Sequence, residues 1–105
     1  MSEKRYHICL SVPLGQRNGI MFVHESDGQV EGWLEVMNCK NAFHGQLSNN
    51  GELTISGAIR SLVSTIDYTA VGTISGQKIL LNLKTMTGVY YQVFGEEFEF
   101  DDKVL

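Results

Sequence analysis

The sequence predicts an all-β fold, an antiparallel eight-stranded meander that closes, or nearly closes, into an up-and-down barrel. Apolar and polar residues alternate with period two in segment after segment, which is typical of strands with one buried face. The chain has eleven glycines and one proline, and short turn sequences separate the segments. Short turns favour sequential hairpins, and closing such a meander removes the exposed edges of an open sheet.

The alternating segments give the expected strands in chain order. We expect eight, at residues 5–12, 19–24, 29–37, 42–47, 53–62, 66–74, 78–84 and 89–94. The connections hold residues that tolerate positive φ, at 16–19, 26–28, 38–41, 48–51, 75–76 and 87–88. Asn50-Gly51, between the fourth and fifth segments, is the strongest single hairpin signal.

Length and composition indicate one globular domain over residues 1–105. The apolar share of 43% and the charged share of 19% are far from the signature of disorder. No apolar run approaches the roughly 18 to 20 residues that a membrane span needs, and residues 1–5 do not begin a signal sequence. We therefore expect a cytoplasmic protein in which Cys9 and Cys39, which lack Cys-x-x-Cys spacing, are reduced structural thiols.

The net charge of −4 lies at the C-terminal end. Residues 1–95 hold seven acids and seven bases, whereas residues 96–105 hold five acids and one lysine. A neutral body lacks the basic stripe that phosphate contacts require, so we expect no nucleic-acid partner and no binding to anionic membranes. The acidic stretch from about residue 96 is either one more edge strand or a mobile tail.

Four successive strands place a glycine on the expected inner face, at Gly32, Gly45, Gly57 and Gly72. Glycine within a strand weakens it, so such a residue usually marks a sharp bend or a close approach to the backbone. Alternatively, the missing side chains leave interior room for a ligand, since eight-stranded barrels are either just filled or hold one small molecule.

The leading function hypothesis is a barrel that binds a small apolar or aromatic ligand in its interior. An apolar cavity with a few convergent polar groups is the usual form of such a site. The candidate ligand-binding residues lie on, or next to, the side of their strands that carries the apolar residues. They are Tyr68, Tyr90, Gln92, His24 and Ser61.

The alternative is a non-catalytic structural or protein-interaction module that forms a homodimer or higher homo-oligomer. Aromatic residues are enriched in the cores of protein interfaces. Trp33 and Tyr91 lie on strands with more apolar surface than one buried face needs, so they are the candidate interface residues.

No motif predicts catalysis, a cofactor or a metal. There is no Gly-x-Ser-x-Gly elbow and no phosphate-binding glycine loop. The three histidines occupy three different strands, so no two of them have the i, i+2 spacing that would form a metal-binding pair on one strand. His7 and His44 lie on the polar side of their strands. Enzyme activity is the least favoured class, with His24 as its only candidate base.

The meander of eight short strands is similar in plan to the calycin-type barrels, the lipocalin and streptavidin groups. None of their signature motifs is legible in this chain. The resemblance therefore implies an architecture and no function.

Overall fold

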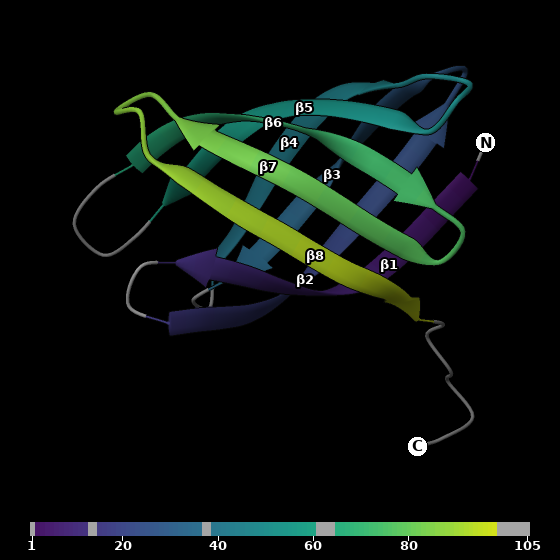
Figure 1. Ribbon diagram of the computed structural model, residues 1–105. Helices are drawn as coiled ribbons and strands as arrows, with labels where there is room; N and C mark the ends of the chain where they lie inside the picture. Colours follow the sequence, from purple (N-terminus) through teal and green to yellow (C-terminus); the bar gives the residue numbers. More distant parts are fainter. Residues whose placement is uncertain (1, 13–14, 37–38, 61–64, 99–105) are drawn as a thin grey trace.

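The computed structural model describes residues 2–12, 15–36, 39–60 and 65–98, and these form a closed antiparallel barrel (Figure 1). The strands follow one another around the barrel in chain order, which confirms the predicted eight-stranded meander. Their bounds are β1 Ser2–Val12, β2 Gly15–Ser26, β3 Gln29–Val36, β4 Cys39–Leu47, β5 Glu52–Arg60, β6 Thr65–Ser75, β7 Lys78–Thr85 and β8 Tyr90–Phe98. Among the described residues, no helix has the length and apolar character needed to cross a bilayer.

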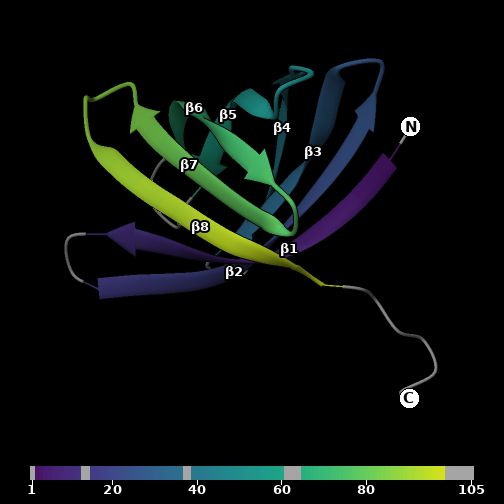
Figure 2. The same cartoon turned by 45° about the vertical axis from the view of Figure 1, so that its right-hand side comes forward.

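The barrel closes where the last strand pairs with the first. In the register of β1 and β8, Tyr6 lies opposite Glu97 and Leu10 opposite Val93, and Figure 2 shows the two strands side by side. This pairing continues to Phe98, so the start of the acidic stretch belongs to β8. Residues 99–105 of that stretch lie outside the described residues.

Several strands extend beyond the segments that alternation predicted. The β1–β2 ladder runs without a break from Ser2 opposite Glu25 to Val12 opposite Gly15. Hydrogen bonding to a neighbouring strand involves only the backbone, so the ladder continues through residues whose side chains do not alternate. The β2–β3 turn is as expected, because Asp27 and Gly28 both have positive φ, as a two-residue hairpin loop requires.

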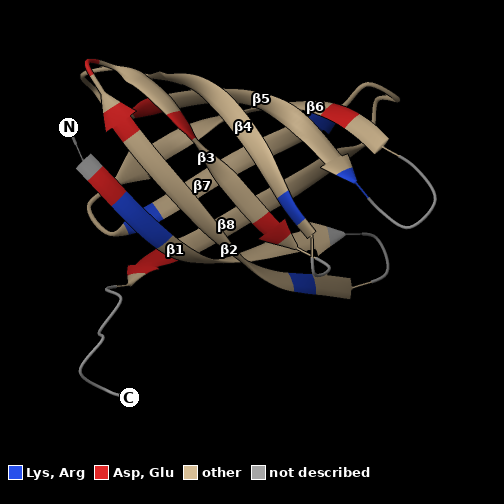
Figure 3. Cartoon of the chain, turned by 180° about the vertical axis from the view of Figure 1, so that it is seen from behind, with Lys and Arg blue, Asp and Glu red and all other residues tan. Residues whose placement is uncertain are grey.

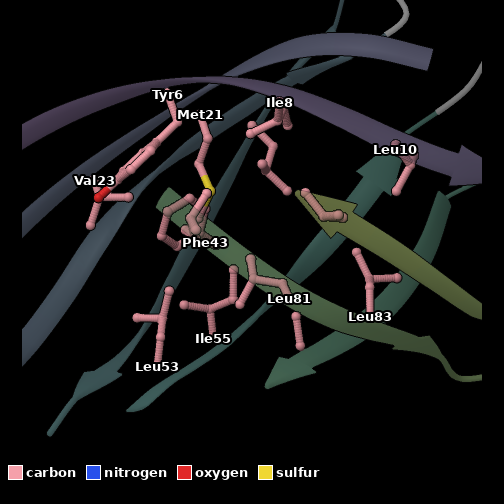
Figure 4. Close-up of a cluster of buried hydrophobic side chains, with 14 of the residues drawn as sticks. Tyr6, Ile8, Leu10, Met21, Val23, Phe43, Leu53, Ile55, Leu81 and Leu83 are labelled. Atoms are coloured by element: carbon pink, nitrogen blue, oxygen red, sulfur yellow. The ribbon is translucent and has the colours of Figure 1, made fainter. Parts of the chain in front are cut away.

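Inward-facing side chains of all eight strands fill the barrel. Figure 4 shows Ile8 and Met21 on one side of the core, pointing toward Phe43 and Leu81 on the other side. The buried apolar residues are Tyr6, Ile8, Leu10, Met21, Val23, Val30, Leu34, Val36, Phe43, Leu53, Ile55, Tyr68, Ala70, Ile79, Leu81, Leu83 and Val93. Gly32, Gly45, Gly57 and Gly72 lie on the same side of β3 to β6 as these buried residues, as the sequence predicts.

The predicted inward orientation of Tyr90 and Gln92, on β8, is wrong. Tyr90, Gln92 and Phe94 are exposed on the outside, whereas Val93 is buried and Tyr91 packs against the core. Both sets of alternate residues along this strand are apolar, so its own sequence does not define which set faces the core. The register decides instead, because Val93 lies opposite residues of β1 and β7 whose side chains are already buried.

Neighbouring atoms occupy the space beside the inner glycines, which favours the bend interpretation. Gly32, Phe43, Gly57 and Tyr68 follow one another across β3, β4, β5 and β6. A Cβ atom on Gly32 would lie 3.0 Å from the Phe43 ring, and one on Gly57 would lie 3.1 Å from the Tyr68 hydroxyl. Aromatic side chains thus cover both glycines from the adjacent strand.

Two buried polar side chains, those of Asn41 and Thr85, form hydrogen bonds with backbone groups at the strand ends. The Asn41 side-chain amide donates to the Cys39 carbonyl at 3.2 Å, and its oxygen accepts from the Arg60 backbone N–H at 3.1 Å. The Thr85 hydroxyl accepts from the Val89 N–H at 3.1 Å. These bonds satisfy polar groups that would otherwise be costly to bury.

Replacing Gly72 by alanine is expected to destabilise the barrel. The added Cβ would lie 1.8 Å from the Leu80 carbonyl oxygen and 2.7 Å from the Leu81 Cα atom, so β6 and β7 must separate. We expect the free energy of unfolding to fall by about 1 to 3 kcal/mol, measured by urea denaturation. Thr73→Ala, at an exposed neighbouring position, is the control, and an equal effect of both variants would contradict the bend interpretation.

Candidate functional site

The four candidate ligand-binding residues that the structure describes do not come together. Tyr68 lies inside the barrel, Tyr90 and Gln92 lie outside on β8, and His24 lies on the outer face of β2. His24 Nδ1 is 3.3 Å from a carboxylate oxygen of Glu3 on β1. Ser61 lies outside the described residues.

Two tyrosine hydroxyls are buried in the barrel without a hydrogen-bond partner, those of Tyr6 and Tyr68. Burial, followed by the negative charge of Glu97, raises the pKa of Tyr6 to about 12. Burial also raises the pKa of Tyr68 well above its usual range. Both hydroxyls are therefore neutral at ordinary pH and offer no charge to a ligand.

Residues of the same chain contact both candidate interface residues. The Trp33 ring stacks on Phe22 with centroids 5.8 Å apart, and the Lys40 ammonium lies 4.5 Å from the Trp33 centroid. The Arg5 guanidinium lies 5.2 Å from the centroid of Phe22. These contacts form a cross-strand row of cations and aromatic rings that stabilises the outer surface of β1 to β4.

Tyr91, the other candidate, packs inward against the core from β8. Both cysteines are free and half-buried, on β1 and β4. His7 and His44 face outward as their parity predicted, and His7 stacks on Phe98 with centroids 3.9 Å apart. In the described part of the chain, no group of three or more His, Cys, Asp or Glu side chains is placed to hold a metal ion.

A polar groove of about 860 Å³ crosses the outer surface of β2 to β5. His24, Glu31 and His44 are register partners along its floor. Acidic and basic residues are interspersed on the side of the barrel seen in Figure 3. The groove itself is lined by two carboxylates, Asp27 and Glu31, and by the two histidines, with no lysine or arginine among its described lining residues.

A second outer groove, of about 790 Å³, is more apolar and extends from β2 across β1, β8 and β7 to β6. Its central residues are Leu80 and Phe94, which are register partners and are each 43% exposed. On β6, Thr73 is the register neighbour of Leu80, and Val71, which is 55% exposed, lies opposite Asn82. We call the eight outward residues of the two strands the β7–β8 face, which comprises Lys78, Leu80, Asn82, Lys84, Tyr90, Gln92, Phe94 and Glu96.

Sequence reasoning did not identify Leu80 or Phe94 as candidate binding residues. The run Ile79-Leu80-Leu81 does indicate an exposed apolar residue. Alternation along a strand places the middle residue of three on the face opposite to its two neighbours, so three apolar residues in a row cannot all face the core. Its two neighbours are buried at 2% and 1% exposure, whereas Leu80 faces solvent.

Fold and surface together define the class of this protein as a closed, eight-stranded, antiparallel up-and-down barrel with a filled core and an apolar outer face. Comparisons of the chain with protein-family models, with curated proteins and with solved structures find no match.

Replacing Tyr68 by phenylalanine is expected to leave the barrel as stable as the wild type or to raise its free energy of unfolding by up to about 1 kcal/mol. The change removes a buried hydroxyl that has no partner. Urea denaturation at neutral pH measures the effect, and Tyr90→Phe, at an exposed position, is the control. A loss of more than about 1 kcal/mol would show that the hydroxyl is hydrogen-bonded in solution.

Stability is expected to decline in alkali because of Tyr6. Its folded pKa of about 12 lies above the ordinary value of 10.0, so its contribution is fully present below pH 10 and is lost as the pH rises toward 12. Tyr6→Phe should therefore lose less stability than the wild type between pH 9 and pH 11 in urea titrations. An unchanged decline in the variant would argue against this role of Tyr6.

Proposed function

We propose that this barrel is a non-catalytic protein-interaction module that binds through its β7–β8 face. The observation that carries the proposal is the exposure of Leu80 and Phe94 side by side as register partners on β7 and β8. An exposed apolar cluster with a polar border is typical of a protein-binding surface.

The same strand shows that this exposure is local. The other outward residues of β7 are polar, namely Lys78, Asn82 and Lys84. A barrel that needed only a solvated outer surface would be served equally well by a polar residue at position 80. The apolar pair is therefore better explained by a partner than by folding.

The interior-ligand hypothesis has less support. Phe43 and Tyr68 cover two of the glycines that would have lined a cavity, and backbone atoms of neighbouring strands lie against Gly45 and Gly72. The described candidate ligand-binding residues also lie on opposite faces of the sheet, Tyr68 inside and Tyr90, Gln92 and His24 outside. Binding of a small molecule in the barrel stays a prediction and is not the function that the geometry favours.

Photo-crosslinking in cells that express the protein tests the proposal. With a benzoylphenylalanine in place of Phe94, we expect protein adducts that disappear when Leu80→Lys is added, because the charge disrupts the apolar centre of the face. The same probe in place of Ile66, which is 36% exposed on β6 outside the face, is the matched control and should give none. Equal adducts at both positions, or none at position 94, would overturn the proposal.

A further inference from the structure

The β7–β8 face is complementary to itself. Each outward residue of β7 lies opposite a residue of β8 with the chemistry that it would bind. The register partners are Lys78 with Glu96, Leu80 with Phe94, Asn82 with Gln92, and Lys84 with Tyr90.

We infer that the partner of this face is a second copy of the chain, related by a two-fold axis that runs over the face, between β7 and β8, along the strand direction. This inference rests on the proposed function. A two-fold axis in that position places β7 of each copy over β8 of the other. A residue of β7 in one copy therefore faces, in the other copy, the β8 residue that is its register partner within its own chain. The face of β7 in one copy then covers the face of β8 in the other.

In this arrangement, every contact pairs complementary groups. Leu80 meets the Phe94 ring of the other copy at the centre, where apolar residues contribute most to association. At one end, the Lys78 ammonium meets the Glu96 carboxylate. At the other end, the Lys84 ammonium, which lies 5.5 Å from the Tyr90 centroid of its own chain, also meets the Tyr90 ring of the other copy. Between the two ends, the amide side chains of Asn82 and Gln92 meet, which adds to the polar border of the interface.

The charges at the first end point to a partner outside the chain. Within the described residues, neither Lys78 nor Glu96 forms an ion pair, although they are register neighbours. Both lie at the border of the apolar groove and are exposed. A second copy would bring two Lys78–Glu96 pairs together, one on each side of the axis.

Two sheets stacked face to face keep their strands within about 30° of each other, which is compatible with an axis along the strands. A partner with a different sequence would need its own apolar centre and its own matching charges. A second copy supplies both without any further assumption.

Charge exchange between two variants tests the inference. Lys78→Glu alone places two carboxylates opposite each other, and Glu96→Lys alone places two ammonium groups opposite each other, so each variant should dimerise roughly tenfold or more weakly than the wild type at low salt. When the two variants are mixed, each mutated residue meets its opposite charge in the other chain. The mixture should therefore form a heterodimer with an affinity close to that of the wild type.

Sedimentation equilibrium measures the affinities, and native mass spectrometry identifies the heterodimer by its mass. Lys40→Glu, on β4 away from this face, is the control and should dimerise as the wild type does. Thermal unfolding of each variant verifies that it is folded. Single variants that weaken dimerisation without heterodimer formation on mixing would overturn the two-fold geometry.

The inference and the proposed function fail in different ways. A purified wild type that stays monomeric, together with Leu80-dependent adducts to another protein in cells, would overturn the second copy and keep the interaction module. Absence of adducts at position 94 together with a monomeric wild type would overturn both.

Discussion

Backbone hydrogen bonding between β1 and β8 is the interaction on which the rest of the barrel depends. The two strands lie at opposite ends of the sequence, and their ladder from Arg5 to Ser11 turns an open meander into a closed surface. Closure pairs each of the eight described strands on both sides. It also fixes which side of β8 faces inward, because Val93 must lie between the buried residues Leu10 and Leu81.

A closed sheet of this kind must bend sharply, and the inner glycines allow the bend. At Gly32, Gly45 and Gly72, a carbonyl oxygen of an adjacent strand lies 1.8 Å from the position of an added Cβ atom, and at Gly57 the Ala42 carbonyl oxygen lies 2.7 Å from it. At Gly32 and Gly57, an aromatic side chain from the next strand also lies against the glycine. Curvature and a filled core are thus produced together, since the residues that permit bending are the ones that their neighbours cover.

The fold could be predicted because its signals are local, whereas the candidate site could not. Alternation and turn residues such as Asn50-Gly51 lie within a few positions of each other, and they indicate strands and hairpins directly. The inner side of β8 depends on pairing with β1, at the other end of the chain, and its own alternation is apolar on both sides. Alternation therefore places Tyr90, Gln92 and Phe94 inside, whereas the structure exposes all three.

The burial of Asn41 shows the same limit for polar residues. The sequence places it in a turn, but its side chain bonds to the backbone of β5 nineteen residues away. Such a role depends on how two strands end relative to each other, and no local pattern contains that information. Local chemistry predicts the elements of this chain, and the register between them decides the positions of individual side chains.

Closure also limits how this molecule can bind anything. Many sheet proteins take up a peptide by adding it as a strand at an open edge. In this barrel such an edge is limited to strand ends, such as residues 15–18 of β2, which pair with β1 but extend beyond the ladder with β3. The interior is occupied by side chains that include two unpartnered hydroxyls, so entry of a ligand would require displacing them. The outer side chains remain, and among those of β7 and β8 the apolar pair Leu80 and Phe94 lies beside the opposite charges of Lys78 and Glu96. The same constraint that stabilises the fold therefore directs recognition to the outer surface of the sheet.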